Sequence, residues 1–139
     1  MLSVYATHGS MVDEETLKRH FRLLVKDKAS LAIKAAVVVY ENGNVADRVG
    51  KISVKSKDLK EFRRTFDVSE AETVRFNGVT YCVKDLSTNQ IVAFNGAKYL
   101  IVTRTEVTYI VVVCISRQQC VTVASWVDRI ARKLRERNI

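Results

Sequence analysis

The stretch that decides the fold is TYIVVVCI, residues 108–115, which is apolar at nearly every position. A strand with one face in water alternates apolar and polar residues, whereas this run offers apolar side chains to both faces. It is therefore predicted to lie inside a sheet that is covered on each side. A helix is predicted to follow over residues 119–137, because apolar residues recur there at helical spacing, as Val123, Val127, Ile130 and Leu134.

Further strands are predicted on the N-terminal side of this run. Runs rich in β-branched and aromatic residues alternate with turn-forming Asn-Gly and Ser-Thr-Asn sequences, which predicts strands over residues 73–76, 79–84, 90–94 and 98–103. An earlier pair, 33–40 and 45–49, flanks Asn42-Gly43, a dipeptide that suits a hairpin turn. Two more helices are predicted, over residues 13–28 and 58–66, the second capped by Asp58.

This order of elements predicts an α+β fold with a central antiparallel sheet of about six to seven strands. The N- and C-terminal helices are expected on one face of the sheet and the short helix on the other. The chain contains no proline and no linker-like segment. Residues 13–139 are therefore predicted to form one domain, preceded by an N-terminal extension over residues 1–12 that could be flexible.

Composition excludes several classes of protein. With 139 residues, 47% hydrophobic and 27% charged, the chain is an ordinary soluble globular domain by composition. No apolar run approaches the ~20 residues that span a bilayer, and the first ten residues lack a signal-peptide pattern, so a cytoplasmic protein is expected. Cys82, Cys114 and Cys120 form no metal-binding spacing, and no metal or other cofactor is expected. Cys82 and Cys114, inside strand-like runs, are expected to be buried free thiols.

No pattern in the sequence favours catalysis. The chain lacks a nucleophile motif, a glycine-rich phosphate loop and a zinc-protease motif. Its two histidines lie within the first twenty residues, and its carboxylate pairs lie where solvated helix starts and loops explain them. We therefore expect no enzymatic activity and no catalytic residues.

The charge balance is basic, with 23 Lys and Arg against 15 Asp and Glu and a net charge of +8. Basic residues concentrate in residues 51–64 and in the last helix. They could form solvated faces, or they could bind an anionic lipid or an acidic protein surface. Nucleic acid is not favoured, because the aromatic residues occupy core-periodic positions rather than alternating with the basic ones. Trp126 lies beside the apolar stripe of the last helix, either at the core edge or as a partner contact.

Several strings, in this order, resemble the profilin family of small actin-monomer-binding proteins. AAVVVY (35–40) resembles the family's first strand, and GVTYCVKD (78–85) is similar to its strand that ends in a basic residue. IVTRT (101–105) resembles a later strand, and Gln119-Cys120 opens the last helix as in many members. The resemblance covers most of residues 13–139 and indicates a divergent member. Valine-rich strands and missing aromatic residues would suit an archaeal or early-branching one.

The resemblance implies that the protein binds monomeric actin, or an actin homologue, and regulates filament assembly in the cytoplasm and cytoskeleton as a monomer. Carried over position by position, the actin-binding residues would be Lys84, Ala97, Tyr99, Gln118, Gln119, Ala124, Ser125, Asp128 and Arg129. Several of the helix positions do not keep the family's polar and aromatic pattern, so details of the contact would differ.

Anionic phosphoinositide headgroups are a plausible competing ligand for the last helix and for the basic cluster in residues 51–64. The expected lipid-binding residues are Arg129, Arg132, Lys133, Arg135 and Arg137. The family's polyproline site is not favoured, because it stacks proline rings on aromatic residues of both terminal helices. The predicted first helix has only Phe21, and the last helix ends without an aromatic residue.

Two other classes share this order of elements. A roadblock- or longin-type scaffold, which docks on a small GTPase or a membrane complex, also combines a five-stranded sheet with flanking helices and usually dimerises. A small-molecule sensor of the PAS type would need an internal cavity, whereas the many valine and isoleucine residues here indicate a filled core.

Overall fold

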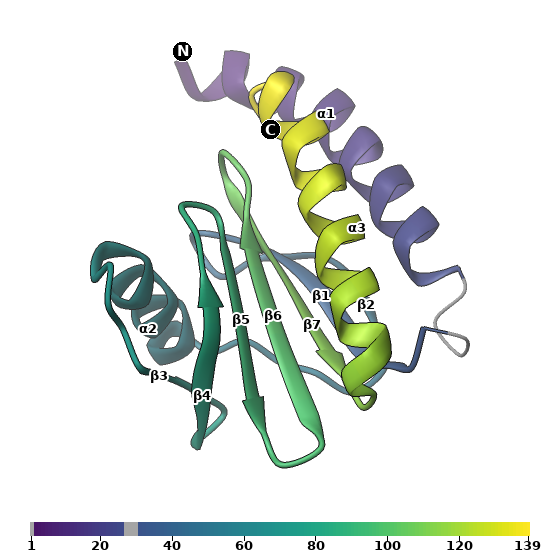
Figure 1. Ribbon diagram of the computed structural model, residues 1–139. Helices are drawn as coiled ribbons and strands as arrows, with labels where there is room; N and C mark the ends of the chain where they lie inside the picture. Colours follow the sequence, from purple (N-terminus) through teal and green to yellow (C-terminus); the bar gives the residue numbers. More distant parts are fainter. Residues whose placement is uncertain (1, 27–30) are drawn as a thin grey trace.

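The computed structural model describes residues 2–26 and 31–139, with side chains from residue 14 onward (Figure 1). The described part consists of three helices and seven strands. In chain order these are α1 (Leu2–Val25), β1 (Ile33–Tyr40), β2 (Val45–Val49), α2 (Ser56–Asp67), β3 (Thr73–Phe76), β4 (Val79–Leu86), β5 (Gln90–Asn95), β6 (Lys98–Arg104), β7 (Thr108–Cys114) and α3 (Arg117–Glu136).

The strands form one antiparallel sheet in the order β2-β1-β7-β6-β5-β4-β3. Strands β3 to β7 are a meander, and β7 then pairs with β1 as well as with β6. All seven residues of β7 are buried. This confirms the prediction that TYIVVVCI forms a strand covered on both faces.

Helices cover both faces of the sheet. In Figure 1, α1 and α3 lie side by side on one face, and α2 lies on the other near β3 and β4. Alternate side chains of β1 point to opposite layers: Val38 packs under α1 and α3, and Val37 packs under α2. The predicted α+β fold, with terminal helices on one face and a short helix on the other, is confirmed.

Helix α1 is longer than predicted. It begins at Leu2 rather than at residue 13, so residues 2–12 continue the helix, and it ends at Val25. The last residues of the predicted range, 27 and 28, lie outside the described residues. Its inner face carries Leu17, Phe21 and Leu24, which are almost fully buried against the sheet and α3. None of the described helices is long and apolar enough to cross a membrane.

Helix α2 begins at Ser56, with Lys55 rather than Asp58 at its N-cap, so the predicted cap position is wrong. Asp58 lies in the first turn, and its carboxylate Oδ2 accepts a hydrogen bond from the Lys55 N–H at 2.9 Å. Its Oδ1 accepts from the Asn77 N–H at 3.1 Å, in the turn after β3. Glu61 Oε2 accepts from the Arg75 N–H at 3.0 Å. The outer edge of β3 is therefore closed by carboxylates of α2.

The three cysteines are free thiols, but only two of them are buried. Cys114 and Cys120 lie in the core beneath α3, and burial raises the pKa of the Cys114 thiol to about 12. Cys82 is exposed, so the prediction of its burial is wrong. Its neighbours in β4, Tyr81 and Val83, point into the layer under α2, which leaves Cys82 on the other face, where α3 does not reach.

Candidate functional site

Helices α1 and α3 leave part of their face of the sheet uncovered. The uncovered part lies over β4 and the adjoining ends of β5 and β6 (Figure 1). Cys82 and Lys84 on β4 are exposed, and Phe94 on β5 keeps 36% of its surface accessible. We call this region, with Tyr99 and the outward side of the first half of α3, the open face.

Aromatic rings form the floor of the open face. Phe94 and Tyr99 are directly opposite each other in β5 and β6, and their ring centroids lie 6.2 Å apart. Lys84 Nζ lies 6.0 Å from the centroid of the Tyr99 ring, near the limit of a cation–π contact. Burial raises the pKa of the Cys120 thiol, and the positive charge of Lys84 counteracts this rise. Lys84 therefore extends from β4 across the sheet toward α3.

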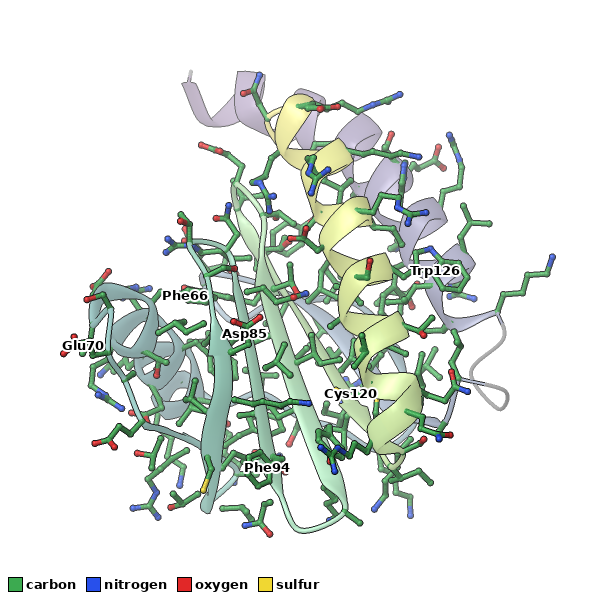
Figure 2. The ribbon with its side chains drawn as sticks, viewed as in Figure 1. Phe66, Glu70, Asp85, Phe94, Cys120 and Trp126 are labelled. Atoms are coloured by element: carbon green, nitrogen blue, oxygen red, sulfur yellow. The ribbon has the colours of Figure 1, made fainter. Side chains whose placement is uncertain are left out.

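Helix α3 forms the wall of the open face and is fixed to the sheet. Gln90 Nε2 donates to the main-chain oxygen of Ala124 at 2.8 Å and to Thr103 Oγ1 at 2.9 Å. At the start of the helix, Ser116 Oγ accepts from the Gln119 N–H at 3.2 Å, an ordinary N-cap. Figure 2 shows Phe94 on the sheet and Cys120 in the first half of α3. The floor and the wall are thus held in one arrangement.

The structure places most residues predicted to bind actin around the open face. Ala97 lies in the turn between β5 and β6, and Gln118 and Gln119 lie in the first turn of α3. Five side chains are exposed, namely those of Lys84, Ala97, Gln118, Ser125 and Arg129. Gln119 and Asp128 are half-buried, and Asp128 forms an ion pair with Arg132 at 3.1 Å. Tyr99 and Ala124 are buried, each 8% exposed, so a partner could touch only their edges.

Sequence reasoning missed three residues of this face. Val121 is 63% exposed, the largest exposed fraction among the large apolar side chains of the described residues. Its position away from the apolar stripe of the last helix could have identified it. The sequence pattern predicts core positions for the aromatic residues, Phe94 among them, and a buried thiol for Cys82. Val121, Trp126 and Arg129 line a shallow hollow of about 390 Å³ on α3.

Trp126 lies at the edge of the core. Its ring is half-buried and packs against the residues beneath α1 and α3. Figure 2 shows it on the side of α3 that faces α1. This packing supports the interpretation of Trp126 as an anchor at the core edge, with one side open to the hollow.

The basic residues predicted to bind lipid run from Arg129, at the margin of the open face, to Arg137, just beyond the C-terminal end of α3. Arg132 is paired with Asp128, and Arg135 Nη1 donates to the main-chain oxygen of Arg104 at 2.8 Å. The side chains of the other three are exposed and form no ion pair with any residue that the structure describes: Arg129, Lys133 and Arg137. Arg129 is the member shared with the predicted actin-binding set.

The C-terminal end of the chain packs against the turn between β6 and β7. Ile139 is 2% exposed, and its main-chain oxygen accepts from the Val107 N–H and from Thr105 Oγ1, both at 2.9 Å. Phe21 of α1 is also buried. Neither residue therefore offers a surface on which a proline ring could stack, and the side chain of Tyr5 lies outside the described ones.

Among residues 14–26 and 31–139, no group of three or more histidine, cysteine or carboxylate side chains could hold a metal ion. The chemistry that the open face offers is that of a protein interface, with exposed apolar and cationic side chains on a rigid support.

Comparisons with known proteins identify the family. The sequence model of the profilin family matches residues 20–139, and no curated protein matches the sequence significantly. Profilin IA of Acanthamoeba castellanii is similar in structure, with a TM-score of 0.70 and 18% identity over 86% of this chain and 98% of that chain.

Two further solved structures agree. LokiProfilin2, in its complex with rabbit actin, has a TM-score of 0.69 at 14% identity, covering 88% of this chain and 97% of that chain. Profilin of Schizosaccharomyces pombe has a TM-score of 0.68 at 13% identity, covering 80% and 91%. The matched family is profilin rather than a roadblock, longin or PAS family. The chain belongs to the profilin family, as a divergent member.

Proposed function

We propose that this protein binds monomeric actin, or an actin homologue, through the open face and thereby regulates filament assembly in the cytoplasm. The match to the profilin family over residues 20–139 is the observation that carries the proposal. The similarity to LokiProfilin2, which was solved in complex with rabbit actin, supports it.

The chemistry of the open face suits a protein partner with acidic patches. Phe94 and Val121 supply exposed apolar area on the sheet and on α3. Lys84 and Arg129 supply cations beside them, and the net charge of +8 would speed the approach to an acidic surface. Apolar anchors surrounded by charged residues are the usual composition of a specific interface.

A protein that covers a surface through which actin monomers contact one another would keep the bound monomer from joining a filament through that surface. The expected effect on assembly is therefore a dose-dependent decrease of polymerisation rate. The monomeric state and the cytoplasmic location belong to the same proposal.

The experiment is a polymerisation assay with pyrene-labelled actin, using both a heterologous actin and the actin homologue of the host. Lys84→Glu should weaken binding about tenfold, because it reverses a charge in the centre of the face. Lys60→Glu is the matched control: it makes the same change in net charge on α2, on the opposite side of the sheet. Equal effects of the two substitutions, or no effect of the wild type on either actin, would contradict the proposal.

The last helix suggests modulation by phosphoinositides. Arg129, Lys133 and Arg137 have unpaired side chains among the described residues, and anionic headgroups bind clustered cations of this kind. Because Arg129 belongs to both predicted sets, a bound headgroup and actin should exclude each other. Vesicles that contain phosphatidylinositol 4,5-bisphosphate should then restore polymerisation that the protein has slowed. Vesicles without effect on that polymerisation would remove the lipid claim.

A further inference from the structure

A second hollow lies on the side of the sheet that carries α2, away from the open face. It has a volume of about 160 Å³ and lies between the connection from β2 to α2 and the end of the sheet at which β1 and β6 begin. Its rim carries three lysines, which come from β1 (Lys34), from the connection (Lys51) and from β6 (Lys98). Its floor is apolar and includes Ile52, Phe76 and Tyr81, all of them buried.

The connection from β2 to α2, residues 50–55, packs closely against β1 at Gly50. The backbone of Gly50 has a φ of +80°, and an added Cβ would lie 2.9 Å from the Lys34 carbonyl oxygen and 3.0 Å from the Ala35 Cβ. Only glycine fits this approach without displacing the strand. The close contact places the backbone of Lys51, the next residue, near that of Lys34. The hollow is therefore built by the fold rather than by chance proximity of flexible side chains.

The positive charge around the hollow is not compensated. Neither this hollow nor the adjoining, more open one of about 550 Å³, to which Arg48 contributes, is lined by a carboxylate. Lys34, Lys51 and Lys98 are exposed and form no ion pair or side-chain hydrogen bond with other described residues. Arg48 is held in place, because its Nη1 donates to the main-chain oxygen of Ile52 at 3.2 Å.

Carboxylates on the neighbouring helix do not neutralise these lysines. Asp58 accepts hydrogen bonds from two main-chain N–H groups, and Glu61 is bound by Arg64 and by the Arg75 N–H. Cations that converge without an acidic partner favour an anion between them.

We propose that this lysine-rimmed hollow binds a compact phosphorylated ligand, with phosphate groups on Lys34, Lys51 and Lys98 and a ring on the apolar floor. A cavity of about 150 Å³ holds a benzene-sized body, so this half-open hollow of about 160 Å³ has room for one six-membered ring. The adjoining open hollow, which shares Lys51 and Ile52 with it, leaves room for phosphates on the rim. The site lies on the face opposite to the open face, so it does not depend on the proposed binding of actin.

Phosphate is favoured over carboxylate by the number of cations. Three lysines line this hollow, and Arg48 lines the adjoining one together with Lys51. A phosphate monoester brings up to two negative charges and three acceptor oxygens to such a set of cations. The phosphate could belong to a soluble molecule or to a lipid headgroup, and the test separates these sources.

The test is isothermal titration at low salt with benzene-1,4-diyl bisphosphate, which carries two phosphate monoesters on one six-membered ring, supported by NMR shifts of the main-chain amides. The wild type should bind with a saturable isotherm, and the largest shifts should lie at Lys51, Ile52 and Tyr81. The triple substitution Lys34→Gln, Lys51→Gln and Lys98→Gln should weaken binding about tenfold or more. Its control is Lys18→Gln, Lys26→Gln and Lys60→Gln, which removes the same charge from exposed positions outside both proposed phosphate sites. Circular dichroism confirms that both variants are folded.

Each result decides the proposal. Weaker binding of the soluble ligand by the first variant alone supports the proposal. If the soluble ligand does not bind, binding to vesicles with phosphatidylinositol 4,5-bisphosphate that depends on the three lysines also supports it, with a lipid as the source of the phosphate. Equal loss in both variants would overturn it, because binding would then follow net charge alone. Absence of binding to either ligand would overturn it too. If polyglutamate binds as tightly as the phosphorylated ligand and its binding depends on the same three lysines, the proposal of a phosphorylated ligand is overturned in favour of an acidic peptide.

Discussion

Replacing Asp58 by alanine tests how α2 is joined to the sheet. Asp58 is 3% exposed, and its two oxygens accept hydrogen bonds from the Lys55 N–H at 2.9 Å and the Asn77 N–H at 3.1 Å. A hydrogen bond to a charged group contributes about 1.5–3 kcal/mol, which sets an upper range of about 3–6 kcal/mol for the pair. Because Lys55 and Asn77 are exposed residues, water can reach their N–H groups after the substitution. We therefore expect a loss of about 2–4 kcal/mol in the free energy of unfolding.

Urea denaturation followed by circular dichroism measures this loss. Asp58→Asn keeps the size of the side chain and one acceptor oxygen, so its loss should fall between those of alanine and wild type. Asp67→Ala is the control, because Asp67 is exposed in the last turn of the same helix and forms no hydrogen bond with other described side chains. Its effect should stay within about 0.5 kcal/mol. If Asp58→Ala cost no more than Asp67→Ala, the inferred link between α2 and the sheet would be refuted.

Three further predictions follow from the core, the edge and the last helix. Phe62→Ala should lower the free energy of unfolding by about 3–5 kcal/mol in the same assay, because the ring is fully buried in the layer under α2. A loss below about 1 kcal/mol would contradict its place in the core. The hydrogen bond from Arg64 keeps the pKa of Glu61 below its ordinary value of 4.5, although burial opposes this. Ionised Glu61 thus stabilises the fold above about pH 4.5, and Glu61→Gln should lower the free energy of unfolding by about 1 kcal/mol at pH 7. This loss should vanish as the pH falls through the lowered pKa of Glu61. A loss that is independent of pH would be inconsistent with this. Arg132→Glu with Lys133→Glu should weaken sedimentation with phosphoinositide vesicles, and unchanged sedimentation would remove α3 as the lipid site.

The sheet and its layers could be predicted because each strand carries its burial pattern in its own residues. The run 108–115 shows an apolar residue at almost every position, and β7 is buried throughout. Short-range turn signals such as Asn42-Gly43 and Asn77-Gly78 then fix where neighbouring strands reverse. The order of elements and the layer that each helix covers follow from this local information.

Helix ends were harder to predict. Residues 2–12 of α1 include Gly9, which disfavours a helix by about 1 kcal/mol, so the pattern pointed to a start at the acidic residues 13–15. Asp58 was three positions from its predicted role, because a carboxylate suits both the N-cap and the first turn of a helix. Both errors concern helix N-termini, where several residues satisfy the same physical requirement.

The sites depend on tertiary placement and were only partly predictable. The exposure of Cys82 depends on how far α3 extends over a seven-stranded sheet, which no local pattern contains. Lys84 and Arg129 could be placed in one surface only through the resemblance to profilins. The lysine-rimmed hollow joins Lys34 and Lys98, which are far apart in the sequence and meet only because β1 and β6 flank β7.

The exposed thiol of Cys82 allows the most direct test of the proposed actin-binding face. Cys82 and Lys84 are on the same face of β4, while Cys114 and Cys120 are buried and should stay unmodified in the folded protein. The measurement is the rate at which maleimide modifies Cys82, followed by mass spectrometry of its peptide, with and without saturating monomeric actin. Binding through the open face predicts that actin slows the modification at least about fivefold. An unchanged rate in a complex whose formation is shown independently would contradict the assignment of actin to this face.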